Sequence, residues 1–156
     1  MGCDIHTIVG VKTESGWVAI SGSDDDNFFG NRDYRIFGFL AGVRNYSGAT
    51  PISLPRGWPD DMSGAAKDYS ADWGCDAHSR SWLSVEELLA FDYGQMTEDR
   101  RTERRTGSNS WDCVATAEPG MGVAMTYREF LGEHFFKELD RLVKLPQGHE
   151  ARLLFL

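Results

Sequence analysis

The first segment of the chain alternates apolar and polar residues as a β-strand does. Over residues 4–11 the side chains of Ile5, Thr7, Val9 and Val11 fall on one face, and Asp4 and His6 share the other. Glu14–Gly16 has the composition of a turn, and the β-prone run 17–20 follows it. The pattern therefore predicts an N-terminal antiparallel hairpin.

Helical periodicity and capping signals recur further along the chain. Four helices are predicted, over 32–43, over 63–73 with Ser63 as its cap, over 84–91, and from 126 to the region of Pro146. The last two open with the capping boxes Ser84-Val85-Glu86-Glu87 and Thr126-Tyr127-Arg128-Glu129, in which a serine or threonine and a glutamate three residues later satisfy each other's backbone amides. Leu88, Leu89 and Phe91 should form the buried side of the third helix.

The segments between these helices carry different signals. Residues 21–31 and 44–61 are rich in chain-breaking residues and predict loops, the second long enough to serve a site. Residues 75–83 suggest extended structure, and the polar stretch 95–109 an exposed arm or ordered loop. The apolar segment 151–156 predicts a strand inside the sheet. We therefore expect one α+β domain over residues 1–156, in which a small antiparallel sheet of the N-terminal hairpin and the C-terminal strand has helices packed on one face.

Composition narrows the classes of function. The chain has 156 residues, of which 41% are hydrophobic, and a formal net charge of -8. That charge argues against nonspecific binding of duplex DNA and against a polybasic membrane anchor. No apolar run approaches the roughly 18 residues of a membrane helix, and three cysteines suit reduced thiols. We expect a soluble protein of the cytoplasm.

A short pattern occurs twice and suggests a site. Gly2-Cys3-Asp4-Ile5-His6 is repeated as Gly74-Cys75-Asp76-Ala77-His78. In extended segments the aspartate and histidine of each copy project from one face. Two such segments side by side would gather Asp4, His6, Asp76 and His78, a mixed oxygen and nitrogen set that suits Zn, Mn or Fe. A metal-bound hydroxide could then hydrolyse a phosphoester, with His6, His78 and Asp76 as the catalytic groups.

The same residues allow four other readings, one of which has Cys75 as a nucleophile and His78 as its base. Cys3, Cys75, His6 and His78 could form a tetrahedral zinc site if the backbone turns. His6 and His78 could act as acid and base without a metal, although the two-histidine phosphoesterases have Ser or Thr where this chain has Ile8 and Arg80. The repeated pairs could also be a buried polar scaffold without chemistry.

A second group of residues is suited to binding a nucleotide. Arg56 and Arg80 could clamp a phosphate, and tryptophans such as Trp58 and Trp82 could stack on a base. Asn45 belongs to the long loop and is a further candidate for ligand binding. Packing over the sheet is the competing role for each of these aromatic residues.

Several of these segments together resemble a family of uncharacterised bacteriophage and prophage proteins. The resemblance rests on Met1-Gly2-Cys3-Asp4-Ile5-His6, the segment 34–45 ending Leu-Ala-Gly-Val-Arg-Asn, Pro51-Ile52 with Pro55-Arg56-Gly57, and Asp76-Ala77-His78-Ser79 through Ser81-Trp82-Leu83. It covers about the first ninety residues and implies a small phage product acting in the cytoplasm of an infected bacterium.

That context gives two leading hypotheses. The first is a metal-assisted hydrolase of a nucleotide or nucleotide immune signal, and the second is a noncatalytic protein that sequesters such a signal. A sequestering protein should bury its ligand and form a homo-oligomer. A third reading, an acidic mimic of nucleic acid that blocks a host enzyme, ranks last because the acidic residues are spread through the chain.

Overall fold

The structure is a computed structural model that describes residues 4–20, 27–30, 32–105 and 111–156. Cys3 and most of the loop predicted over 21–31 lie outside this part of the chain. The chain divides into two compact units, each described by itself. The first comprises Met1–Arg32, Pro55–Phe91 and Glu133–Leu156, and the second comprises Asp33–Leu54 and Asp92–Gly132.

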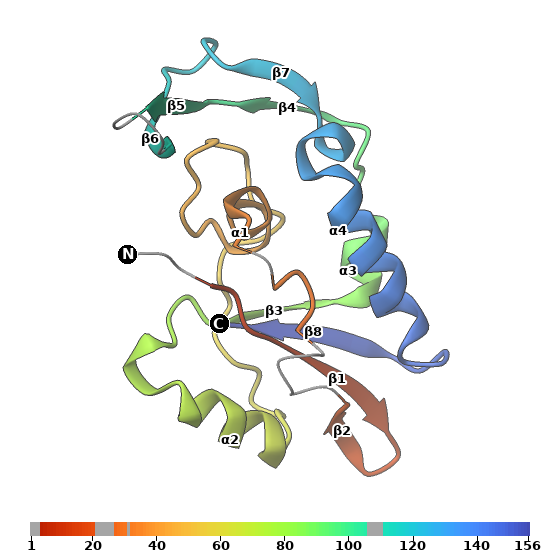
Figure 1. Ribbon diagram of the computed structural model, residues 1–156. Coiled ribbons are helices and arrows are strands. Elements are labelled where there is room, and N and C mark those ends of the chain that lie inside the picture. The colour runs from red at the N-terminus through yellow and green to blue at the C-terminus, as the bar shows by residue number, and fades with distance from the viewer. Residues whose placement is uncertain (1–3, 21–26, 31, 106–110) are drawn as a thin grey trace. The chain divides into compact units, whose positions relative to one another are not determined.

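A four-stranded antiparallel sheet forms the centre of the first unit (Figure 1). Its strands, in spatial order, are β2 (Gly16–Ala19), β1 (Thr7–Thr13), β8 (Ala151–Phe155) and β3 (Ser81–Ser84). The predicted N-terminal hairpin pairs Val11 with Val18, and the C-terminal strand lies inside the sheet between β1 and β3. The α+β fold class, with the hairpin and the C-terminal strand in one sheet, is confirmed.

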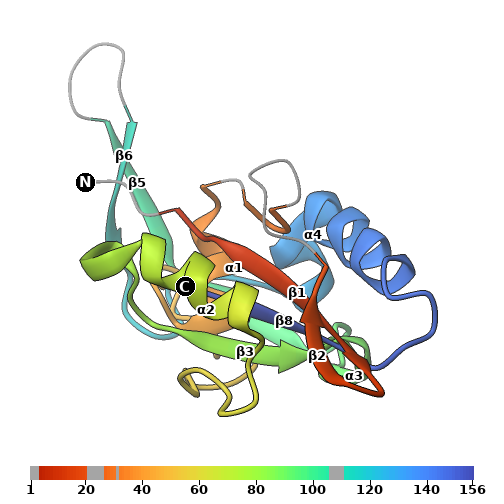
Figure 2. The same ribbon diagram turned by 90° about the horizontal axis from the view of Figure 1, so that it is seen from below.

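Helices pack on this sheet. Helix α2 (Gly64–Asp72) covers one face, where Met62 and Ala66 contact Ile8 of β1 and Leu154 of β8. Figures 1 and 2 show the later turns of α4 (Tyr127–Lys144) over the opposite face. Because both faces are covered, the first five residues of β1 are all buried, whereas alternation alone predicted a half-buried strand.

The predicted caps are present in the structure. The Ser63 hydroxyl accepts the Ala66 amide at the start of α2. Both capping boxes form, with Ser84 and Glu87 opening α3 (Val85–Ala90) and Thr126 and Glu129 opening α4. The predicted buried side of α3 is only partly correct. Leu88 is fully buried, but Leu89, the next residue around this helix of six residues, is 55% exposed.

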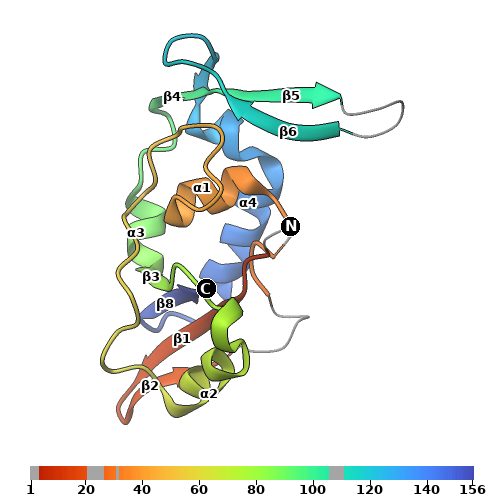
Figure 3. The ribbon, with the colours of Figure 1, turned by 90° about the vertical axis from the view of Figure 1, so that its left-hand side faces the viewer.

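The second unit contains helix α1 (Tyr34–Ala41), two antiparallel strand pairs and the first turns of α4. Strand β4 (Met96–Asp99) pairs with β7 (Val123–Thr126), as Figure 1 shows, and β5 (Arg101–Arg105) pairs with β6 (Trp111–Thr116), as Figure 3 shows. The ordered loop that the sequence offered as one reading of 95–109 is therefore wrong for 96–105, which forms strands. Apart from Met96 the segment 96–105 is polar, so it lacks the alternation by which a half-buried strand is recognised.

An aromatic cluster and a glycine shape the second unit. The ring of Phe39 lies 6.0 Å from that of Tyr93 and 5.7 Å from that of Tyr127, measured between centroids. The regular path of α4 is interrupted at Gly132, which has φ 72° and ψ 173°, a combination open almost only to glycine. Within the described residues, no helix has the length and apolar character needed to span a membrane.

Candidate functional site

The first copy of the repeated pattern is held by contacts with its neighbours. The Asp4 carboxylate accepts two hydrogen bonds of 2.8 Å from Arg32, which hold the pKa of Asp4 below its ordinary value. The His6 backbone pairs with Leu156, and its imidazole stacks on the Trp73 indole at 3.6 Å between centroids. Asp4 is thus engaged by an arginine.

The second copy does not have the extended conformation expected of it. Gly74–Asp76 forms a single turn of 3-10 helix directly after α2, starting at Gly74 with φ 50°. The prediction of extended structure over 75–83 is therefore wrong for this turn and correct for β3. Asp76 and His78 are both exposed, and the His78 ring nitrogen Nδ1 lies 3.2 Å from the Ser79 hydroxyl.

The structure does not bring the two copies together as metal ligands. Among the residues it describes, no three His, Cys, Asp or Glu side chains form a group that could hold a metal ion. Asp4, His6, Asp76 and His78 all belong to the described residues, whereas Cys3 of the alternative zinc site does not. The metal-bound hydroxide therefore stays a prediction from the repeated pattern.

A different constellation lies on the sheet of the first unit. Cationic and aromatic side chains alternate across it, each within about 6 Å of the next: Lys12, Trp17, Arg152, Trp82 and Arg56. We call these five residues the cation–aromatic row. The Arg152 guanidinium lies 3.9 Å from the Trp17 ring centroid and 5.8 Å from the Trp82 ring centroid. The Arg56 guanidinium lies 5.1 Å from the Trp82 ring centroid.

The strand register explains how the row forms. Arg152 pairs with Gly10 of β1 on one side and with Ser84 of β3 on the other. A Cβ atom at Gly10 would lie 3.5 Å from the Trp17 ring and 3.6 Å from the Arg152 side chain. Glycine at this position therefore leaves the space that these two side chains fill above the sheet.

Arg152 is the buried centre of the row. Its side chain is only 4% exposed, and its Nη1 donates to Asp61 Oδ1 at 2.7 Å. A hydrogen bond from Arg152, and to a smaller extent one from Trp17, helps to hold the pKa of Asp61 below its ordinary value. Within the described part of the chain, Arg152 Nε is buried without a hydrogen-bond partner. Arg152 thus supports both indoles from beneath the surface.

Arg56 is the accessible end of the row. It comes from the proline-rich loop, where its backbone amide donates to the Ser81 hydroxyl of β3. Its guanidinium donates to both carboxylate oxygens of Glu87, at 3.0 and 2.6 Å. The Arg56 pairing and the backbone amide of Ser84 lower the pKa of Glu87 to about 2, against the effect of burial. The side chains of Arg56 and Glu87 are 31% and 40% exposed, so solvent reaches this pair.

The other predicted ligand-binding residues of this unit have structural contacts. The Trp58 indole donates to the Ser70 hydroxyl at 2.9 Å and packs against the apolar cluster beneath α2. Arg80 directly precedes β3, and its carbonyl accepts the Gly57 amide. Its Nε is buried and, in the part of the chain described, has no hydrogen-bond partner. Arg56 and Trp82 are therefore the predicted residues in direct contact with one another.

Asn45 belongs to the second unit and supports a loop there. Its amide donates to the Ala49 carbonyl at 2.6 Å and accepts the Ser47 hydroxyl at 2.9 Å. A Cβ atom at Gly38 of α1 would lie 2.8 Å from the Asn45 side-chain oxygen, so the asparagine packs directly on this helix. These contacts give Asn45 a role in folding.

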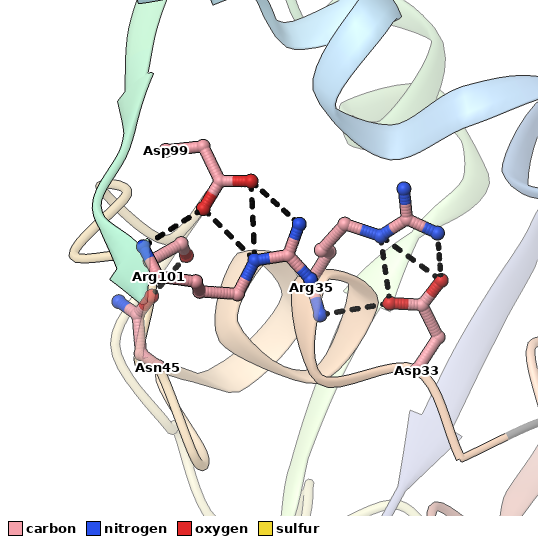
Figure 4. A network of polar contacts seen from close by, with 6 residues as sticks. Asp33, Arg35, Asn45, Asp99 and Arg101 are labelled. Atoms are coloured by element: carbon pink, nitrogen blue, oxygen red, sulfur yellow. Dashed lines mark hydrogen bonds and ion pairs between the residues drawn. The ribbon is translucent and has the colours of Figure 1, made fainter. Parts of the chain in front are cut away.

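Near Asn45, two ion pairs of the same design lie next to one another (Figure 4). In each, an aspartate accepts the backbone amide and the guanidinium of the arginine two residues later, Asp33 from Arg35 and Asp99 from Arg101. Burial raises the pKa of both carboxyls, but the hydrogen bonds from the arginines outweigh it, and the net pKa is lowered. The four charges neutralise each other locally.

Sequence reasoning missed Trp17 and Arg152 as members of a site. The available signal was Arg152, the one charged residue of an otherwise apolar C-terminal segment 151–156, since a buried arginine needs a partner. No family model, curated protein or solved structure matches the chain.

Proposed function

We propose that the protein binds a nucleotide without chemically changing it, and that Arg56 and Trp82 make the primary contacts. The observation that carries this proposal is the partly exposed Arg56 guanidinium, which lies 5.1 Å from the centre of the Trp82 ring. An arginine fork can hold a phosphate through two parallel hydrogen bonds. An indole or a guanidinium plane can stack on a nucleobase.

The rest of the row supports this role by ordering the contact surface. Arg152 lies against Trp82 and is held by Asp61, so the indole is supported before a ligand arrives. A preorganised surface loses less side-chain freedom on binding and binds more tightly. Given the resemblance to phage proteins, a nucleotide immune signal of the bacterial host is the ligand we propose to screen first.

Metal-assisted hydrolysis of a nucleotide stays a prediction from the repeated pattern. Among the described residues, no contact favours it over binding alone, because Asp4 is paired with Arg32 and Asp76 lies in an exposed turn. The binding proposal therefore predicts that the ligand is recovered chemically unchanged.

The test is equilibrium dialysis of the purified protein against a panel of nucleotides and cyclic dinucleotides, followed by chromatography of the bound ligand. We expect at least one ligand to bind and to be recovered intact. Arg56→Ala should weaken binding about ten- to a hundredfold, which corresponds to the loss of a hydrogen bond to a charged group.

Lys137→Ala is the matched control for Arg56→Ala, because it also removes one positive charge. Lys137 lies on α4, is 76% exposed and pairs only loosely with Glu133 at 3.7 Å. We expect this variant to bind as the wild type does. The proposal is wrong if no nucleotide binds, if Arg56→Ala and Lys137→Ala have equal effects, or if the ligand is recovered as a hydrolysis product.

A further inference from the structure

The Glu87 carboxylate is fixed beside Arg56 by contacts that do not involve Arg56. Its Oε2 accepts the Ser84 backbone amide at 2.9 Å, and the Glu87 amide in turn donates to the Ser84 hydroxyl at 3.0 Å. These are the two reciprocal bonds of the capping box of α3. The carboxylate will therefore stay in place when Arg56 releases it.

The three cations of the row all have a carboxylate partner, but only one of them is suited to exchange it. Lys12 lies 3.2 Å from Glu150 in a pair that is more than half exposed, where such contacts contribute little. Arg152 is buried and cannot reach a ligand in solvent. Arg56 combines partial exposure, a bidentate partner and a neighbouring indole.

We propose that Glu87 is a built-in competitor for the Arg56 guanidinium and sets the affinity of this site for phosphate-bearing ligands. The proposal rests on the function proposed above. A ligand must displace the Glu87 carboxylate before its own anion can take the Nη1 and Nη2 donors that Glu87 now holds. A ligand carboxylate only replaces one carboxylate by another, whereas a phosphate brings three acceptor oxygens and up to two charges.

Glu87→Gln separates the competing charge from the cap. Glutamine serves at this position of a capping box as glutamate does, so its amide oxygen can still accept the Ser84 amide. It carries no charge to hold Arg56. Glu86→Gln is the matched control, because Glu86 is the neighbouring residue of the same helix, is exposed, and loses the same charge.

Two probes are titrated into the wild type and both variants: adenosine monophosphate and inorganic pyrophosphate. Binding is followed by calorimetry and by the NMR signal of the Arg56 side-chain Nε–H group. We expect Glu87→Gln to bind both probes about two- to fivefold more tightly, the equivalent of one partly exposed ion pair. The affinity of Glu86→Gln for both probes should stay within about twofold of the wild-type affinity, because the charge of Glu86 does not compete for Arg56 and surface charges contribute little.

The outcomes separate the competitor from the nucleotide function. If the wild type binds adenosine monophosphate and Glu87→Gln binds neither probe more tightly, the competitor role is wrong and the function stands. If pyrophosphate binds more tightly to Glu87→Gln while no nucleotide of the dialysis panel binds, the nucleotide function is wrong and the competitor role stands. If neither probe and no nucleotide of the panel binds the wild type, both proposals are wrong.

Discussion

Asp61→Ala should destabilise the protein much more than the exposure of Asp61 suggests. The Asp61 side chain is 63% exposed, and substitutions of exposed residues usually change the free energy of unfolding by less than about 0.5 kcal/mol. Its partner Arg152, however, is only 4% exposed and lies between two indoles. Removing the carboxylate leaves that buried guanidinium without its charged acceptor.

The size of the effect follows from the burial of Arg152. Breaking a fully buried ion pair by removing one partner costs about 3–5 kcal/mol, and leaving a buried donor unsatisfied costs about 1–3 kcal/mol. Because the Asp61 end of the pair is open to solvent, water can hydrate Nη1 after the substitution. We therefore expect a loss of about 2 kcal/mol, roughly thirtyfold in the unfolding equilibrium.

Urea denaturation followed by far-ultraviolet circular dichroism measures this loss without relying on the nearby tryptophans. Asp60→Ala is the matched control, since Asp60 is the preceding residue of the same loop and is also exposed. We expect the control to stay within about 0.5 kcal/mol of the wild type. Equal stabilities of Asp61→Ala and Asp60→Ala would refute the reasoning that Asp61 neutralises a buried charge.

The same pair has a predictable dependence on pH. The pKa of Asp61 in the folded protein lies below its ordinary value of 3.8. The stabilisation by its carboxylate is therefore complete above that value and is lost as the pH falls through the lower pKa of the folded state. The difference in stability between the wild type and Asp61→Ala should narrow as the pH is lowered below 3.8.

Three further predictions concern the backbone and the caps. Gly132→Ala should lower the free energy of unfolding by about 1–3 kcal/mol in chemical denaturation, because alanine is strained at the φ and ψ of this residue. Gly64→Ala is the control, because the added Cβ meets nothing within 4 Å there. An equal effect of the two substitutions would contradict this reason. Ser84→Ala should cost about 1 kcal/mol by loss of the α3 cap, and an unchanged urea midpoint would show that the cap contributes nothing. The wild type should have a higher free energy of unfolding than Glu87→Gln, with the whole difference present above pH 4.5 and a smaller one toward pH 2. The reason is that the folded state lowers the pKa of Glu87 to about 2. A difference in urea denaturation that does not depend on pH would contradict this.

Local signals in the sequence were sufficient for most of the first unit and for the start of α4 in the second. Alternation located the hairpin, and the serine and threonine caps located the starts of α2, α3 and α4, because these features depend on residues within one turn or strand. The turn at Gly74 was not foreseen, since residues 75–83 were read as extended structure. The second copy forms a turn that follows directly on α2.

The candidate site was less accessible to sequence reasoning because its contacts are not local. Arg56 and Trp82 were named as candidates, but their contact depends on how the proline-rich loop runs beside β3. Trp17 and Arg152 join them only through the order of strands in the sheet. No spacing in the chain records that a residue near the C-terminus lies between tryptophans from β2 and β3.

NMR of the tryptophan indoles tests directly whether the row is a nucleotide-binding surface. The protein is labelled with ¹⁵N at tryptophan, the Trp82 signal is identified with Trp82→Phe, and the ligand found by dialysis is added to saturation. We predict a shift of the Trp82 signal while that of Trp58, whose indole is bonded to Ser70, stays in place. An unmoved Trp82 signal at saturation would contradict binding at this row.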